Sequence, residues 1–478
     1  MTVSTQPDEA LTADRRGPST GRHLQALTGL RLFAALAVYF SHLPAPLGAP
    51  RWLLTLQQSG YVGVTFFFVL SGFVLTLNYF DRLRTPQQLW SYAVARIARV
   101  YPLYLVVLAW PTIGLWAAGT LPKHDLLLHV LGLQAWNSDL GVAYGFVAPA
   151  WSISVELFLY ATLPLLVAMV RLVDRRIWTL LGSVALVLAV LAATAYVFQR
   201  TGRGDLGWAD PASAHRWLYR TPLMRVGDFL LGILAARIYL KLRDRAVGAR
   251  LGWWLIVPAA GVSVILAAQP ALVFTAWSWD AMYAPLAAAL ILSLALAPTH
   301  PVSRLLSQRT IVFLGEASFA FYLIHYTVLH LLGAGAWSSG VTPALVVVEA
   351  FNLGLTTALA IGLHVGIEKP ARVIVKRLLG RKPAAGDDRI PPRRRHAGGA
   401  DRPLDRSRPS RHSNRPAQEE LLDVPQPVRQ RELVDAMSAP VAPAQDGWTP
   451  PATRAPADDP IPVSVPATAP PRRTVSPR

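Results

Sequence analysis

An arginine and a histidine lie within the first long apolar segment of this 478-residue chain. Arg31 and His42 are eleven positions apart, which in an α-helix is about 20° beyond three full turns and roughly 16 Å along the axis. Both side chains should therefore share one helix face at different depths. Arginine holds phosphate well, and histidine takes up a proton near neutral pH. The pair indicates a site for an extended donor, with its anionic end at Arg31 and its reactive end at His42. The alternative is snorkelling by Arg31 and simple packing by His42.

A carboxylate stands near the start of a later apolar segment, in the sequence Trp151-Ser152-Ile153-Ser154-Val155-Glu156. Ser152 and Glu156 are one turn apart and share a helix face. Glu156 could orient His42 or polarise an acceptor hydroxyl, or it could form a structural ion pair with a neighbouring helix.

A polar stripe of the same kind, Ser318, Tyr322 and His325, follows at i, i+4 and i+7 of a third segment. Such a stripe is expected to face a cavity, with hydrogen bonding between helices as the competing explanation. His330 and His364 are weaker candidates for the site. The chain has no cysteine, which excludes thiolate nucleophiles and disulfides, and no spacing typical of a metal site is present.

The elements that must position these residues are membrane helices. Apolar residues make up 53% of the chain and charged residues only 15%, a composition that favours a lipid bilayer as solvent. We therefore predict an all-α integral membrane protein with about ten transmembrane helices, each of roughly 20 residues. The expected spans are 27–45, 60–79, 100–119, 147–170, 177–198, 222–240, 250–268, 277–298, 311–333 and 342–367. A shorter apolar piece, 126–133, is expected to lie at the interface or to re-enter the membrane.

Lysine and arginine are concentrated after the even-numbered spans, as in Arg96 and Arg99 after the second. This predicts that those loops and both termini face the cytoplasm, in the plasma membrane. The basic loop after the fifth span is an exception. A cleaved signal peptide is a poor alternative for the first span, because Arg31 and His42 interrupt its apolar run.

The two ends of the chain differ from its middle in composition. Residues 1–23 and the Pro- and Arg-rich residues 379–478 are expected to be disordered in the cytoplasm, and residues 24–378 form the membrane domain. The formal net charge of +18 is explained by loops and tail, so no nucleic-acid partner is expected.

Six segments form a recognisable set of motifs, in this order: Gly29 to His42, Gly63 to Phe73, Arg96 to Pro102, Trp151 to Glu156, Arg225 to Gly232 and Gly315 to His325. Taken together, these motifs resemble the acyltransferase 3 family of bacterial membrane O-acyltransferases over roughly residues 24–375. Asp228 stands where a glutamate is commoner in the family, and Ile153 where a leucine is; both changes are chemically mild.

The resemblance implies transfer of an acyl group, acetyl by default, from cytoplasmic acyl-CoA to a hydroxyl of a glycan or other acceptor, without a bound cofactor. It implies His42 as the acid/base residue, Arg31 in donor binding and Glu156 as a further functional residue. We expect Arg96 and Arg99 to help bind the donor, and Trp151, Ser152, Tyr322 and His325 to support the site or the acceptor. A secondary transporter, and more remotely a scaffold that uses the tail, are the rival classes.

Overall fold

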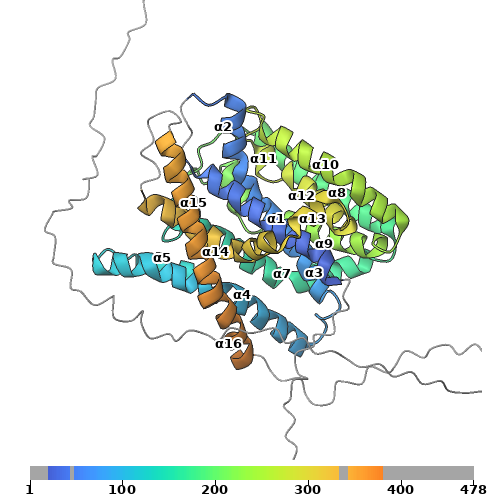
Figure 1. Cartoon of the computed structure of the whole chain (residues 1–478), viewed down its shortest axis with the longest axis horizontal. Helices are drawn as coiled ribbons and strands as arrows, with labels where there is room; N and C mark the ends of the chain where they lie inside the picture. The colour runs from blue at the N-terminus through green and yellow to red at the C-terminus, as the bar shows by residue number, and fades with distance from the viewer. Residues whose placement is uncertain (1–19, 44–47, 333–342, 380–478) are drawn as a thin grey trace, which may run out of the picture. The chain divides into compact units, whose positions relative to one another are not determined.

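The computed structural model describes residues 20–43, 48–332 and 343–379, and every regular element among them is helical (Figure 1). The predicted terminal segments lie largely outside these ranges. The long helices are α1 Thr20–Ser41, α3 Val62–Tyr79, α4 Pro86–Ala117, α7 Trp151–Val173, α8 Ile177–Arg200, α9 Val226–Leu242, α10 Ala246–Ala267, α12 Tyr283–Leu296, α14 Arg309–Leu331 and α15 Pro343–Leu363. The shorter ones are α2 Arg51–Gln58, η1 Ser59–Tyr61, α5 Lys123–Leu131, η2 Gln134–Trp136, α6 Leu140–Tyr144, η3 Ala148–Ala150, η4 His215–Arg220, α11 Ala276–Trp279, α13 Pro301–Leu306, η5 His364–Glu368 and α16 Lys369–Leu379.

Within the described ranges, nine helical segments are long and apolar enough to cross a membrane. They correspond to nine of the ten expected spans, so the prediction of an all-helical multi-pass membrane protein is confirmed. The expected span 222–240 is α9, which has 17 residues and a length of about 26 Å. It is a little shorter than a hydrocarbon core of roughly 30 Å, and most of its side chains are buried by other helices.

Helix α4 begins fourteen residues before the expected start of the third span. Thr85 accepts a hydrogen bond from the Gln88 backbone N–H, and the Gln88 side chain bonds back to the Thr85 N–H, which is a capping box. Pro86 occupies the first helical position, where its missing N–H costs nothing. The apolar pattern begins only later, so hydropathy alone does not reveal this first part of α4, which carries Arg96 and Arg99.

Glycines bring several helices into backbone contact. A Cβ atom on Gly232 of α9 would lie 2.0 Å from the Val69 carbonyl oxygen of α3, and one on Gly72 would lie 2.1 Å from the Phe229 carbonyl oxygen of α9. A Cβ atom on Gly315 of α14 would lie 2.0 Å from the carbonyl oxygen of Thr28 in α1. Helix pairs α3 with α9 and α1 with α14 therefore pack as closely as backbones allow.

The sides of the helix bundle are apolar. Trp178 on α8, Trp254 on α10 and Trp116 on α4 are 76%, 72% and 71% exposed. Exposed aromatic and aliphatic side chains on this scale fit contact with lipid rather than water. Helix α5, over the predicted short apolar piece, has nine residues and is too short to span.

Candidate active site

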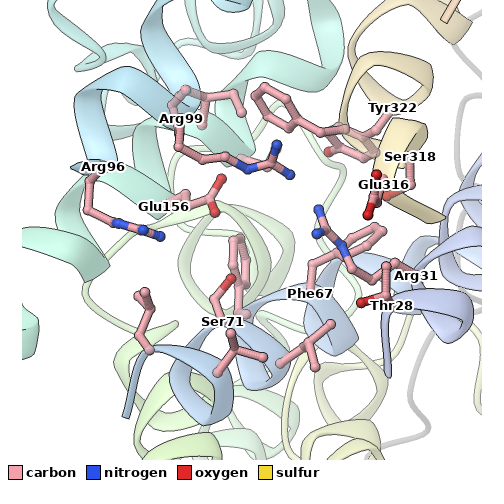
Figure 2. A pocket seen from close by; sticks show the side chains of 18 of the residues that line it. Thr28, Arg31, Phe67, Ser71, Arg96, Arg99, Glu156, Glu316, Ser318 and Tyr322 are labelled. Atoms are coloured by element: carbon pink, nitrogen blue, oxygen red, sulfur yellow. The ribbon is translucent and has the colours of Figure 1, made fainter. Parts of the chain in front are cut away.

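A cavity of about 600 Å³ lies among α1, α3, α4, α7 and α14, and residues of η5 and α16 complete its wall. Its charged side chains are Arg31, Arg96, Arg99, Glu156, Glu316, Lys369 and Arg372. Figure 2 shows Arg31 and Arg99 extending into this space. Towards Val64, Phe67 and Ile153 the lining is largely apolar. The cavity thus combines a cationic part with an apolar part, which suits a ligand that is anionic at one end.

The arginines of α4 are held by aromatic rings. The Arg96 guanidinium lies 5.4 Å from the centre of the Tyr79 ring and 5.5 Å from that of Tyr160, and it donates a 3.4 Å hydrogen bond to the Tyr79 hydroxyl. Tyr160 donates in turn to the Glu156 carboxylate. Glu156 therefore belongs to the cavity, where it interacts electrostatically with Arg31 and Arg96.

A second carboxylate, Glu368, lies at the charged part of the cavity and is only 1% exposed. It forms ion pairs with Arg99 and Arg372. Its Oε2 lies 2.7 Å from Nδ1 of His364, which belongs to the same π-helical turn, η5. Single π-helical turns next to α-helices are frequently found at functional sites. Glu368 neutralises two arginines that a bound anion could otherwise contact.

Glu316 forms the edge of the cavity on α14. Its Oε2 lies 3.4 Å from Nζ of Lys369 and 3.8 Å from Nε2 of His364. Glu316 also lines a second hollow on the other side of this edge.

Two hydroxyls mark the inner end of the cavity. Ser152 and Tyr322 both line it, and both donate hydrogen bonds to the Pro149 carbonyl oxygen, at 2.9 and 3.2 Å. Ser318 lines the cavity as well and donates to the Gly315 carbonyl at 2.7 Å. The predicted polar stripe thus faces a cavity at Ser318 and Tyr322.

His42 does not line this cavity. It follows directly after α1 and is exposed, with its ring 5.0 Å from that of His325. Tyr39, Phe321, Tyr322 and His325 form a set of touching rings between the cavity and His42, which we call the aromatic partition, with ring centres 5.6 to 6.4 Å apart. Arg31 therefore lies in the cavity and His42 outside it, which their spacing on α1 does not reveal.

The two histidines have the same hydrogen-bonding arrangement. His42 Nδ1 lies 2.8 Å from the Val38 carbonyl oxygen, and His325 Nδ1 lies 2.6 Å from that of Tyr322. Because a carbonyl only accepts, each Nδ1 carries the proton and each Nε2 presents a lone pair. Among the described residues, His325 Nε2 is buried and has no hydrogen-bond partner. An acceptor hydroxyl could donate its one hydrogen bond to either Nε2.

Trp151 lies away from the cavity, in an aromatic cluster at the same end of the bundle as His42. Its ring is 4.7 Å from that of Tyr219, and Tyr219 lies 5.6 Å from His215. Burial, and the charge of Arg220, lower the pKa of His215 to about 3. Trp151 therefore supports the loops rather than the cavity.

The site also contains four charged residues that the sequence motifs did not point to, namely Glu316, Glu368, Lys369 and Arg372. Glu316 could have been found, because a carboxylate within an expected span is a candidate by its cost of burial. Lys369 and Arg372 follow the tenth expected span, where basic residues indicate the orientation of the loop but not a site. The position of Glu368 against Arg99 depends on how α16 packs on α4, which no spacing in the sequence reveals.

Comparisons with known proteins agree with the geometry. The profile of the acyltransferase domain family, Acyl_transf_3, matches residues 24–364. Acyltransferase MdmB of Streptomyces mycarofaciens is 32% identical over 75% of this chain and 93% of its own length. Nodulation protein 10 of Rhizobium leguminosarum bv. viciae is 28% identical over 67% of this chain and 88% of its own. A Staphylococcus aureus protein provisionally named an O-acetyltransferase is 23% identical over 64% of this chain and 51% of its own. No solved structure matches the chain.

Proposed function

Because the chain belongs to the acyltransferase 3 family of membrane acyltransferases, we propose that it transfers an acyl group from cytoplasmic acyl-CoA to an acceptor hydroxyl. The default acyl group is acetyl. The observation that carries the proposal is the cavity, in which Arg31, Arg96 and Arg99 surround a space that becomes largely apolar towards Val64, Phe67 and Ile153. This arrangement supports a phosphate-bearing donor whose acyl end lies innermost.

In the proposed complex, the arginines bind the diphosphate of CoA, and Glu156 keeps Arg31 and Arg96 oriented. Lys369 and Arg372 add positive charge at the same part of the cavity. The thioester lies near Ser152 and Tyr322, beside the aromatic partition. Binding the donor in a closed site both positions the thioester and excludes water, which would otherwise hydrolyse it.

His42 is the proposed general base. Its Nε2 removes the proton from the acceptor hydroxyl while the hydroxyl oxygen attacks the thioester carbonyl. The C–S bond then breaks, and the CoA thiolate takes up a proton. His325 lies beside His42, and Tyr322 lies beside His325 and lines the cavity. These two side chains would carry the proton from His42 across the aromatic partition to the CoA thiolate. The acceptor hydroxyl at His42 and the thioester in the cavity lie on opposite sides of the aromatic partition, so its rings must move before the two groups can meet.

A covalent route is the second candidate, favoured by the exposed position of His42 beyond the cavity. The acyl group would pass first to His42 Nε2, with release of CoA, and then to the acceptor. Rapid quenching after addition of radiolabelled acetyl-CoA without acceptor distinguishes the two routes. Label on wild type but not on His42→Ala supports the covalent one.

The test of the proposed function is CoA release by purified protein in nanodiscs, with acetyl-CoA and a panel of acceptors. The panel should include polysaccharide, lipid-linked sugar, peptidoglycan fragments and a macrolide. Acceptor-dependent release should occur in wild type and disappear in His42→Ala. His124→Ala, which changes an exposed histidine in α5, is the matched control and should retain activity. Equal release by His42→Ala would contradict the mechanism, and transport without CoA release would favour the transporter class.

A further inference from the structure

A second hollow, of about 410 Å³, adjoins the cavity and has no part in the mechanism above. It is lined by Gln25, Ser307, Arg309, Val312, Phe313 and Glu316. Glu316 is shared with the cavity, so the two spaces meet at one side chain. We propose that this hollow is the binding site for the 3′-phosphoadenosine end of the donor, an inference that rests on acyl-CoA being the donor.

The geometry of α14 supports one continuous ligand across both spaces. Arg309, Phe313 and Glu316 are at i, i+4 and i+7, so they lie on one face of the helix. From Arg309 to Tyr322 the axial distance is about 20 Å. A donor that follows α14 would have its nucleotide at Arg309, would pass Glu316 and would place its thioester beside Tyr322.

The chemistry of the hollow matches a phosphorylated nucleoside. Arg309 is exposed, and within the described part of the chain no carboxylate is paired with it. Its guanidinium is free to bind a phosphate through two N–H groups. Phe313 is half-buried and offers a ring on which adenine can stack, with Nζ of Lys369 5.6 Å from the ring centre. Gln25 and Ser307 provide neutral polar groups for the base and ribose.

Glu316 determines how the phosphates are distributed. Its carboxylate repels phosphate at the point where the spaces meet, although Lys369 partly offsets its charge. The diphosphate therefore belongs with the arginines of the cavity, and the 3′-phosphate belongs beyond Glu316, at Arg309. The two cationic regions correspond to the two separate phosphate groups of CoA.

The proposed nucleotide site can be tested by binding measurements on the full-length protein in detergent, with no acceptor present. The probes are CoA, 3′-dephospho-CoA and 4′-phosphopantetheine. Wild type should bind CoA roughly five- to tenfold more tightly than 3′-dephospho-CoA, as expected for one partly exposed arginine–phosphate pair. In Arg309→Gln this ratio should fall to about one, with the affinity for 3′-dephospho-CoA unchanged. Arg304→Gln changes an exposed arginine of α13 that lines neither space, and it should keep the wild-type ratio.

A second variant tests whether adenine stacks on Phe313, and its binding of 4′-phosphopantetheine shows whether the protein is still folded. Phe313→Leu keeps the apolar volume but removes the stacking surface, so it should weaken CoA and 3′-dephospho-CoA by the same factor and leave 4′-phosphopantetheine unaffected. An unchanged ratio in Arg309→Gln, a ratio of one in wild type, or loss of all three ligands in either variant would overturn the assigned site. If wild type does not bind CoA at all, the proposed donor is overturned as well. If CoA binds but Arg309→Gln keeps the wild-type ratio of affinities for CoA and 3′-dephospho-CoA, only the nucleotide site is overturned.

Discussion

Replacing Glu368 with glutamine should affect stability and donor binding in opposite directions. Glu368 is 1% exposed and pairs with Arg99 and Arg372, whose side chains are 16% and 31% exposed. Removing one partner of a buried pair typically costs 3–5 kcal/mol. Because both arginines reach the cavity, water solvates them partly, and we expect a cost of about 2 kcal/mol. The melting temperature should fall by roughly 3 °C.

The same change should tighten CoA binding, because Glu368 competes with the donor for these arginines. A phosphate about 7 Å from the lost charge, at an effective dielectric constant of about 40, gains roughly 1 kcal/mol, or about fivefold in affinity. The assays are thermal unfolding in detergent and isothermal titration with CoA. The control is Asp81→Asn, which neutralises an exposed pair with Arg84 and should change neither quantity. Weaker CoA binding by a folded Glu368→Gln protein would refute the reasoning. Glu368 would then be needed to hold Arg99 and Arg372 in position for the donor, rather than compete with the donor for them.

Three further predictions concern other parts of the molecule. His325→Asn should lower turnover by about tenfold or more while CoA affinity stays the same, since His325 lies outside the cavity; a parallel loss of CoA binding would contradict this. Gly232→Ala should destabilise the protein by roughly 1–3 kcal/mol through the contact with Val69, whereas Gly182→Ala, with open space around it, should be neutral by thermal unfolding. The pKa of His215 is about 3 in the folded protein and roughly 6.5 in the unfolded chain, so the unfolded chain binds this proton first as the pH falls. The free energy of unfolding should therefore be highest above pH 6.5 and should be lower by about 2 kcal/mol at pH 5. In His215→Gln the melting temperature should decline less between pH 6.5 and pH 5, and the same decline as in wild type would contradict this prediction.

The membrane helices could be predicted well from the sequence because apolar length is a local property. The start of α4 was not predicted, because hydropathy does not mark its first turns; the signal that the sequence does carry there is the capping box of Thr85 and Gln88, with Pro86 at the first helical position. The sequence also does not distinguish α9 from a spanning helix, because a short helix buried by its neighbours has the same composition as a lipid-facing one.

The chemistry-bearing residues were found individually, but their grouping was not. Arg31, Glu156 and Tyr322, each a candidate site residue from the sequence, do line the cavity. Spacing on α1 put Arg31 and His42 on one face, yet side chains from α14 separate them. Such contacts arise between helices, and a single sequence carries no direct signal for them. The catalytic roles of these residues stay predictions for the assays above.

The glycine contact between α1 and α14 bears on how fast the site can open. Gly315 leaves no room between α14 and the Thr28 carbonyl oxygen, so sliding one helix along the other would meet a backbone clash. The aromatic partition is carried by these same two helices. We therefore expect it to open by rotation of its rings about their side-chain bonds, which is typically much faster than the microsecond-to-millisecond displacement of whole helices. Delivery of the acceptor or release of CoA, rather than a helix motion, would then determine the time taken by each catalytic cycle.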